Sequence, residues 1–461
     1  MGIKLMTNNF SFTSPLIYFT DAVLRAPTIG CMLMCLTAAL VGVIVFLKKQ
    51  SLLGESLSHA AYPGVVIGVL IAGAFGLNEE NQSLTAFLIM ASAFLSALAG
   101  LYCIYYLVNK MKIRTDSALC FILSSFFGVG LTLASQVQFS YTALYRQIQT
   151  YIYGQAATMT DVHSYIYGFF SFIIIVVIIL FYKDIQVMTF DADYAKSIGI
   201  NVRSINTLIF ILITLAVVMG IRSVGVILMS AMLIAPAVAA RQYTNKLYFM
   251  FPLASFFGLI AGFLGNYFSV EINTILSVKY PGERLILPTG PMIVMVASII
   301  CLLSLCFAPE RGWLLRLSRM RRFRSRCISE NLLKTIWRYC HGKDENLTIS
   351  FNEIEKYQSF SPIYLRYLLF KMSIQGFLEK INGDQYKLTK MGKLRAEKII
   401  RLHRLWEVYL AGYLGIGVER VHKNAEEMEH ILTPELEREL TFLLKDPKQD
   451  PHHQPIPPQT L

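Results

Sequence analysis

The stretch ERGWLLRLSRMRRFRSR, residues 310–326, marks a change in the character of the chain. It contains seven arginines and separates two segments of very different charge. Residues 310–461 hold 26 of the 42 lysines and arginines and 19 of the 30 acidic residues. Only 16% of the whole 461-residue chain is charged, against about 25% in soluble globular proteins. We therefore expect two domains of different class, an apolar one before residue 310 and a charged one after it.

Apolar runs before residue 310 predict an all-α polytopic membrane domain, residues 1–309, with about eight or nine transmembrane helices. A helix needs about 20 apolar residues to cross a bilayer. Basic residues such as Lys48 and Lys49 gather at alternate ends of the runs, and the positive-inside rule places these ends in the cytoplasm. The N-terminus is then expected outside and the C-terminal part in the cytoplasm. The nine predicted spans are 29–47, 62–76, 84–108, 117–135, 164–182, 205–220, 223–240, 247–268 and 290–308.

The basic stretch itself is expected to belong to a cytoplasmic linker, residues 310–328. Arginines that directly follow a last span are typical of an anchor on anionic lipid. Contact with a DNA backbone and an exposed protease site are two other interpretations. Composition alone does not separate the three.

The rest of the chain predicts mainly helical soluble domains. Ser361 and Pro362 are typical of a helix start, and Gly376 indicates its end. Asn382-Gly383 is a strong hairpin signal between two short apolar runs. Helix, turn, helix and hairpin form the winged helix-turn-helix arrangement, expected over residues 329–395. A long helix at about 390–412 leads into a further helical domain, residues 396–461.

The membrane segment SLLGESLSHAAYPGV, residues 51–65, contains two ionisable side chains. Glu55 and His59 are four residues apart and share one face of a helix. A carboxylate with an imidazole suits Mn(II), Fe(II) or Zn(II), and ionisable groups at membrane depth are usually functional. The alternative is that Glu55 lies at the cytoplasmic interface and His59 makes a structural hydrogen bond. Spacing alone leaves both open.

A second pattern of metal-binding type lies in RVHKNAEEMEHIL, residues 420–432. Glu426, Glu429 and His430 occupy positions i, i+3 and i+4, so one helix face presents all three. The alternative is a solvated acidic face. Upstream, RLHRLWEVYL (401–410) carries another His and Glu at i and i+4. Nitrogen and oxygen ligands without thiolate favour Mn(II) or Fe(II), and Zn(II) would also bind. The candidates are His403, Glu407, His422, Glu426, Glu429 and His430.

Five stretches resemble, in chain order, the signatures of the metal-specific ABC importer permeases, those for zinc, manganese and iron. The resemblance covers most of residues 30–308. It implies that Glu55 and His59 line the translocation path and coordinate the ion in transit. The family usually has Asp where this chain has Glu55, a departure that bears on metal choice and gate geometry. The stretches are SLLGESLSHAAYPGV (51–65), YIYGQAATMTDVH (151–163), FDADYAKSIGI (190–200), SVGVILMSAMLIAPAVAAR (223–241) and LPTGPMIVM (287–295).

The same resemblance implies partners in a bacterial inner membrane. Asp191, Asp193, Tyr194 and Gly199 lie in the stretch that looks like the cytoplasmic coupling segment, which docks on an ATPase. The chain has no GxxxxGK[ST] phosphate loop, so it is not expected to be an enzyme. We expect a separate cytoplasmic ATPase subunit, an extracytoplasmic metal-binding protein and a second permease subunit.

The tail resembles the diphtheria-toxin-repressor and manganese-regulator family of metal-dependent repressors over residues 329–458. The resemblance lies in LTKMG (388–392), in the two His/Glu stretches and in PIPP (455–458). It places Glu426, Glu429 and His430 in a primary metal site and the three other candidates in or beside an adjoining site. The family takes a further ligand, Met or Asp, from its first helix, and Asn331 stands there. Lys334 stands where manganese regulators have a second acid.

The second helix of the winged domain is expected to enter the DNA major groove with its N-terminal residues at base edges. A net charge of +7 on residues 310–461 suits a DNA partner. A homodimer of the tail on operator DNA is expected, in which residues 396–461 supply dimerisation and metal binding. The candidate DNA-binding residues are Ser361, Tyr364, Arg366, Tyr367 and Lys371.

Permease followed by repressor resembles the permease–repressor fusions of chlamydial metal-import operons. This order implies feedback, in which imported metal loads the tail and the tail represses transcription. A membrane tether restricts dimers on DNA, so we hypothesise that the linker is cut and frees the tail from about residue 320 onward. The alternative is a tail that senses metal and gates transport without binding DNA.

Overall fold

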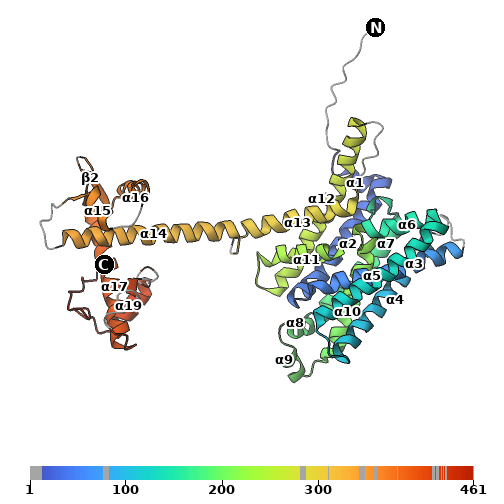
Figure 1. The fold of residues 1–461 in the computed structure, drawn as a ribbon, viewed down its shortest axis with the longest axis horizontal. Helices are drawn as coiled ribbons and strands as arrows, with labels where there is room; N and C mark the ends of the chain where they lie inside the picture. Colours follow the sequence, from blue (N-terminus) through green and yellow to red (C-terminus); the bar gives the residue numbers. More distant parts are fainter. Residues whose placement is uncertain are drawn as a thin grey trace, which may run out of the picture. The chain divides into compact units, whose positions relative to one another are not determined.

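The computed structural model describes residues 13–75, 82–280, 287–309, 311–341, 348–357, 361–381, 383–417, 421, 425–426, 428, 430 and 433–459. The chain forms two compact units, residues 1–316 and 317–461, which are described separately. The first unit is a helix bundle, and the second is a smaller, mainly helical unit with one small sheet (Figure 1). The mainly helical fold predicted for both parts of the chain is confirmed.

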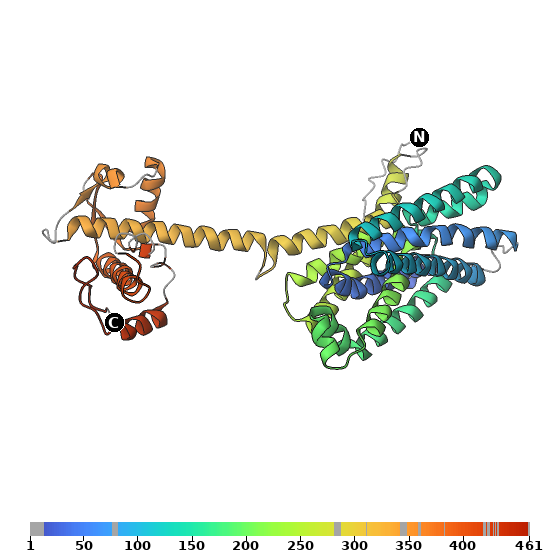
Figure 2. The same ribbon diagram turned by 60° about the horizontal axis from the view of Figure 1, so that its bottom comes forward.

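The first unit is built from long apolar helices packed side by side (Figures 1 and 2). The helix α2 packs against α7, α10, α11 and α12, while α3 packs against α4 and α5. The elements are α1 (Ile17–Thr20), α2 (Ala22–Leu47), α3 (Ser51–Ala74), α4 (Gln82–Asn109), α5 (Thr115–Ser140), α6 (Thr142–Tyr153), η2 (Ala156–Thr158), α7 (Asp161–Leu180), α8 (Tyr182–Phe190), α9 (Ala192–Ser197), α10 (Val202–Val224), α11 (Met229–Arg241), α12 (Leu247–Lys279) and α13 (Thr289–Phe307).

Eight helices in the described part of the chain are long and apolar enough to cross a membrane. Two of the predicted spans were wrong in their extent. The span predicted at 62–76 belongs to α3, which begins at Ser51, so Glu55 and His59 lie inside it. The span predicted at 223–240 is α11, which has only 13 residues and falls short of the roughly 20 needed. It is shortened because α10 continues to Val224 and Gly225 then turns with φ +94°.

Small residues allow the central helices to approach closely. A Cβ at Gly42 on α2 would collide with the backbone of Leu233 on α11, and one at Gly258 on α12 would lie 2.6 Å from the Cys35 carbonyl oxygen. Close approach through small residues is the usual way in which membrane helices pack. The bundle is therefore held by backbone-to-backbone proximity as well as by its apolar side chains.

The second unit combines a winged helix-turn-helix with a long helix. Its helices are α14 (Trp313–Cys340), which begins in the first unit, α15 (Phe351–Tyr357), α16 (Pro362–Ile374), α17 (Lys390–Gly412) and α19 (Pro434–Leu443). The strands β1 (Ile349–Ser350), β2 (Leu378–Ile381) and β3 (Gln385–Leu388) form an antiparallel sheet in the order β1-β3-β2. The apolar core of this unit contains, among others, Leu332, Ile336, Leu368 and Met372.

Several local predictions for this unit agree with the structure. Gly376 and Gly383 have φ values of +76° and +80°, as a helix end and a hairpin require. Asn382 lies outside the described residues. The long helix predicted at 390–412 is α17, and the predicted linker 310–328 is largely helical, because α14 runs through it.

Candidate metal sites

The first candidate site lies on α3, where Glu55 and His59 stand one turn apart. His59 is buried, and the edge of its ring meets the Phe127 ring with the centroids 4.5 Å apart. Among the described residues, no hydrogen-bond partner reaches Nδ1 of His59. Glu55 is half-buried. A buried polar atom without a partner costs about 1–3 kcal/mol, so this nitrogen can gain from a cation that enters the bundle.

Hydrogen bonds fix α3 between its neighbours. The Ser56 hydroxyl donates to the carbonyl of Leu119 on α5 (3.1 Å), and the Ser96 hydroxyl of α4 donates to the carbonyl of Ala60 (2.7 Å). Both bonds join α3 to a helix that packs against it. The position of the His59 ring is therefore set by three helices together.

A polar cluster in the same unit was not predicted from the sequence. Arg222 donates to the Tyr151 hydroxyl (3.2 Å) and to the Thr158 carbonyl (3.3 Å). With His163 it lines a small cavity of about 10 Å³, roughly room for one water. An arginine here repels a metal ion, so the cluster is an unsuitable metal site. The quoted stretch 151–163 contains His163 but offered no signal that this residue lines the same cavity as Arg222.

The predicted ATPase-coupling residues lie on and around α9. The Asp191 carboxylate caps this helix by accepting from the backbone N–H groups of Asp193 (3.1 Å) and Tyr194 (2.9 Å). Asp193 is paired with Lys196 at 2.9 Å, and Tyr194 is exposed. Gly199 has φ +87° and ends the turn after α9. Asp191 and Gly199 thus shape the segment, while Asp193 and Tyr194 are available to a partner.

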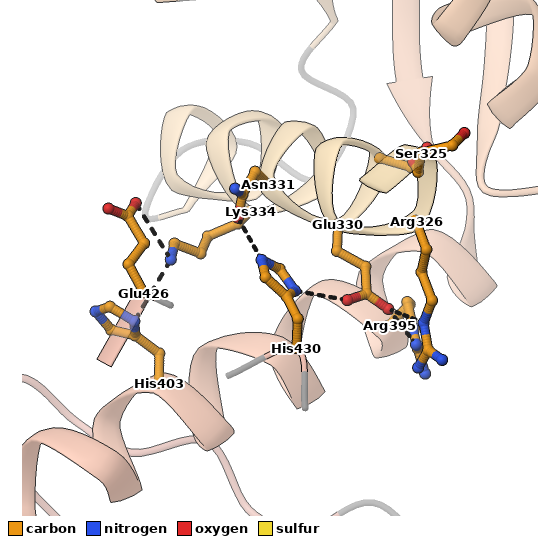
Figure 3. Close-up of polar contacts among 10 residues, drawn as sticks. Ser325, Arg326, Glu330, Asn331, Lys334, Arg395, His403, Glu426 and His430 are labelled. Carbon is orange, nitrogen blue, oxygen red and sulfur yellow. Dashed lines mark hydrogen bonds and ion pairs between the residues drawn. The ribbon is translucent and has the colours of Figure 1, made fainter. Parts of the chain in front are cut away.

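The second candidate site lies in the tail, around His430 (Figure 3). Nδ1 of His430 donates to the Glu330 carboxylate at 2.8 Å, and Nε2 faces the Asn331 side-chain oxygen at 3.1 Å. Burial alone would raise the pKa of Glu330, but hydrogen bonds from His430 and two arginines outweigh it and lower that pKa to about 2. Glu330 therefore carries its charge at neutral pH.

This arrangement suits a cation between His430 and Asn331. A histidine that donates through one ring nitrogen to a carboxylate keeps the other nitrogen free to bind a metal. Here the second nitrogen, Nε2, lies 3.1 Å from an amide oxygen, that of Asn331, and two acceptors facing each other repel unless a proton or cation lies between them. The residues present therefore fit a metal ion bound by Nε2 of His430 and Oδ1 of Asn331.

Three further predicted ligands, His403, Glu407 and Glu426, gather around Lys334. Its ammonium lies 3.5 Å from Nδ1 of His403 and 3.8 Å from the Glu426 carboxylate, and it is buried. Nε2 of His403 lies 3.2 Å from the Glu407 carboxylate. Lys334 therefore supplies the positive charge to this group of ligands.

The seven tail residues predicted to bind metal are thus divided between two places. His430 and Asn331 meet beside Glu330, while His403, Glu407 and Glu426 meet around Lys334. His422 and Glu429 lie outside the described residues. Within the described ranges, no three His, Cys, Asp or Glu side chains form a metal-binding group. Sequence reasoning missed Glu330, and an acid within the apolar pattern of SENLLKTIW was the signal that could have found it.

The predicted DNA-binding residues differ in how they are placed on or beside α16. Ser361 is exposed at its N-terminus, and the rings of Tyr364 and Tyr367 are exposed and stacked 6.3 Å apart. Arg366 is paired with Asp384 of the wing at 3.3 Å. Lys371 is half-buried and donates to the Ser325 hydroxyl at 2.7 Å, so it is turned towards α14.

Residues 20–308 match the ABC 3 transport family. The match covers more than half of the chain, and the chain belongs to this family. Residues 389–458 match a second family, described as "Iron dependent repressor, metal binding and dimerisation domain". The protein is thus a multi-pass membrane permease with a repressor-like C-terminal domain, and both resemblances seen in the sequence are confirmed.

Named relatives are similar over most of the chain or over its permease. A probable metal transport system membrane protein of Chlamydia trachomatis is 37% identical and matches 96% of this chain and 98% of its own length. The manganese transport system membrane protein MntC of Bacillus subtilis is 32% identical, over 83% of this chain and 82% of its own. The zinc transport system membrane protein TroC of Treponema pallidum is 36% identical, over 66% and 95%.

A solved structure of PsaBC from Streptococcus pneumoniae in complex with Fab is also similar. It is 26% identical, has a TM-score of 0.54, and covers 65% of this chain and 97% of its own.

Proposed function

We propose that this chain is the permease subunit of an ABC importer for a divalent transition metal, and that its C-terminal unit is a metal-dependent DNA-binding repressor. The observation that carries the second part is the placement of His430 between Glu330 and Asn331. His430 lies in a segment that matches a metal-binding and dimerisation domain, on the same chain as a permease of the ABC 3 family.

In the membrane unit, Glu55 and His59 are proposed to bind the ion in transit. The buried Nδ1 atom of His59 lacks a hydrogen-bond partner among the described side chains, and its carboxylate neighbour supplies charge. A transit site must bind an ion well enough to admit it and weakly enough to release it. Two protein ligands, with waters completing the coordination, meet both requirements.

The importer is proposed to need three further subunits. A cytoplasmic ATPase would dock on the segment that carries Asp193 and Tyr194, since both are exposed on α9. An extracytoplasmic metal-binding protein would deliver the ion, and a second permease subunit would complete the pore. Basic residues at alternate helix ends support a bacterial inner-membrane location with the tail in the cytoplasm.

The metal is proposed to be Mn(II) or Fe(II), with Zn(II) able to bind. The described tail side chains offer nitrogen and oxygen without a thiolate, the donor set that suits these ions. The relatives named above are named for manganese and for zinc, and the tail family is named for iron. Iron is thus supported by the tail family's name only.

In the tail, the metal would be held by Nε2 of His430 and Oδ1 of Asn331. The resemblance to metal-dependent repressors adds Glu426 and Glu429 as further ligands, and Glu426 would have to leave Lys334, which it contacts at 3.8 Å in this structure. When bound, the metal would supply the positive charge that joins α14 to residues 426–430. Glu330 holds the His430 ring in position, and α16 would then be presented to operator DNA in a homodimer. The exposed Ser361, Tyr364 and Tyr367 are proposed to face the bases.

A gel-shift experiment tests the repressor function. Purified tail, residues 317–461, is mixed with its own promoter, with and without Mn(II), after circular dichroism has shown that it is folded. We expect sequence-specific binding only with metal, and loss of that binding in His430→Ala. Equal binding with and without metal would contradict the proposal.

Release of the tail by proteolysis is a further part of the proposal. The predicted cleavage region lies within α14, where Arg319, Arg321 and Arg324 are exposed. A protease must unwind this helix locally to cut it, so cleavage is expected to be slow and specific. An immunoblot against the tail should show a fragment that begins near residue 320. Full-length chain as the sole species would refute release.

A second candidate function is metal gating of transport without DNA binding. One observation favours it: α14 begins six residues after α13 ends at Phe307, and the same helix carries Asn331. Metal bound at Asn331 could thus act on a helix that leads to the last span. Uptake that continues unchecked at high metal in His430→Ala, with no DNA shift by the wild-type tail, would favour gating.

A further inference from the structure

The tail contains a pocket that neither the transport nor the DNA-binding proposal uses. It has a volume of about 720 Å³ and lies between α14, the C-terminal end of α16 and the first turns of α17. Pockets for small ligands usually measure about 300–1,000 Å³. The pocket therefore has the size of a metabolite site.

Positive charge dominates its lining. Arg322, Arg326, Lys371, Arg395 and Lys398 contribute cations, and Glu330 is the one acid on its wall among the described residues. Lys398 is paired with Glu437 outside the pocket at 3.6 Å. Counting that pair as neutral, the wall keeps an excess of positive charge. An anion in the pocket would be stabilised by this excess.

Two of the cations are well placed to receive a ligand. Lys371 is bonded to a neutral hydroxyl, that of Ser325, and Arg322 makes no ion pair within the described part of the chain. An arginine binds a phosphate group through two parallel hydrogen bonds, and a lysine adds a point charge. Arg322 and Lys371 together therefore suit a phosphate group better than a single carboxylate.

Apart from Ser329 and Gln375, the rest of the lining is apolar. Phe377, Met391 and Leu394 contribute side-chain surface, and Met391 and Leu394 are largely exposed although both are hydrophobic. Apolar surface of this kind gains about 25 cal/mol per Å² when it is covered. A ligand with a phosphate and an apolar or aromatic body would match both parts of the pocket, whereas inorganic phosphate would match only one.

We propose that this pocket binds a small organic phosphate of nucleotide size and that Glu330 couples its occupancy to the metal site. Glu330 has two sets of partners. Its Oε1 atom contacts Arg326 at 3.0 Å and also Arg395, both of which line the pocket, while Oε2 accepts from His430 (Figure 3). One carboxylate thus joins the pocket to the proposed metal ligand.

The direction of the coupling follows from the charges. A phosphate that draws the two guanidinium groups away leaves the Glu330 carboxylate less neutralised. Glu330 then becomes a stronger acceptor for His430, which makes Nε2 a better metal ligand. We expect organic phosphate to tighten metal binding by at least about fivefold, the lower end of typical coupling between sites, and metal to tighten phosphate binding equally. This second half rests on the proposed metal site.

Calorimetry on the detergent-solubilised full-length chain tests the pocket without metal. Adenosine monophosphate should bind with one-to-one stoichiometry, and more tightly than inorganic phosphate. Arg322→Ala and Lys371→Ala should each weaken its binding about tenfold or more, while Arg324→Ala, an exposed arginine on the same helix outside the pocket, should leave it unchanged. No binding at millimolar concentration, or equal binding by all four proteins, would overturn the pocket.

A competition arm identifies the source of the phosphate. Dihexanoyl phosphatidylglycerol, a soluble anionic phospholipid, is added to the nucleotide complex. Displacement would assign the site to a lipid headgroup with its chains, and lack of displacement to a soluble metabolite. Either result supports a pocket that binds an organic phosphate. If neither probe binds, the proposal is rejected.

Mn(II) titrations then test the coupling. Adenosine monophosphate should lower the Mn(II) dissociation constant of the wild-type chain but not that of Glu330→Gln. Mn(II) binding without nucleotide tests the metal site alone, and nucleotide binding without Mn(II) tests the pocket alone, so the two failures are distinguishable. Tight binding of both ligands with no mutual effect would reject the coupling.

Discussion

Two buried histidines, one in each unit, are held in very different ways. His59 lies in the membrane bundle against the Phe127 ring, and its Nδ1 has no hydrogen-bond partner among the described residues. In the tail, both ring nitrogens of His430 face oxygen atoms, and the carboxylate behind one of them is bonded to two arginines. The His59 ring is placed by the packing of its helices and has no hydrogen bond at Nδ1 among the described residues, whereas the His430 ring is held by a hydrogen-bond network.

The difference matches the demands on the two sites. A transported ion must leave, so a ligand that is weakly supported suits a path. A sensed ion must stay until its concentration falls, and outer partners that orient a ligand strengthen its binding. The chain is thus proposed to contain one site, at His59, where a transported ion binds briefly, and one site, at His430, where a sensed ion stays bound. We call these the transit site and the residence site.

The largest effect is expected from His59→Ala. Loss of a transit ligand should reduce metal uptake by more than the roughly 10- to 100-fold that loss of an outer partner costs a metal site. Radioactive manganese uptake into cells that express the whole importer measures this. Ser58→Ala, at the preceding position of α3, is the matched control. Mn(II) binding by the tail should be normal in both variants. Weaker Mn(II) binding by the tail in His59→Ala would contradict the assignment of His59 and His430 to separate sites.

Glu330→Gln should have the next largest effect, on the tail alone. The change removes the charge that holds His430 and should weaken Mn(II) binding by about 10- to 100-fold. Equilibrium dialysis on the full-length chain measures the affinity. Glu379→Gln, a change of the same type at an exposed position of β2, is the control for folding. Manganese uptake should be retained by Glu330→Gln.

A smaller effect of opposite sign is expected from Lys334→Met. The buried ammonium repels a second positive charge nearby and also binds Glu426. Removing it while keeping the length of the side chain should tighten Mn(II) binding about 5- to 30-fold, which corresponds to roughly 1–2 kcal/mol of relieved repulsion. The same dialysis experiment measures the change. Weaker binding would show that Lys334 supports the site.

These residues also show what the sequence did and did not reveal. Apolar runs and cap residues predicted the long helices well, and the bounds of α17 agree closely, because such features are local. The short α11 was misjudged, since its apolar run continues through a turn at Gly225. Glu330 was not predicted because its role depends on a hydrogen bond with His430, 100 positions away in the sequence. Lys334 was noticed, but its place among three predicted ligands is a tertiary fact.

The smallest expected effect is a pH dependence of tail stability. The Tyr339 hydroxyl and the Ser350 N–H and hydroxyl groups bond the Glu353 carboxylate and lower its pKa to about 2. A lowered pKa stabilises the folded state above the unfolded value of about 4.3, and this contribution is lost as pH falls towards 2. Glu353→Gln should therefore unfold at a lower temperature than wild type at pH 6, and the difference should shrink at pH 3.

Fluorescence can follow this unfolding in the intact chain, because two of the three tryptophans, Trp337 and Trp406, lie in the tail unit. The third, Trp313, lies in the first unit, so Trp313→Phe is introduced into every protein compared and the signal then reports on the tail. The control is Lys380→Gln, a change at an exposed residue of the wing that leaves the Glu353 hydrogen bonds in place. A melting difference between wild type and Glu353→Gln that is the same at both pH values would contradict the assignment.

The central claim is that transit and residence are separate sites on one chain. Equilibrium binding of Mn(II) to the purified full-length chain and to two variants, His59→Ala and His430→Ala, tests it most directly. We predict one tight site in the wild type, kept in His59→Ala and lost in His430→Ala. Loss of the tight site in His59→Ala, or its survival in His430→Ala, would contradict the account.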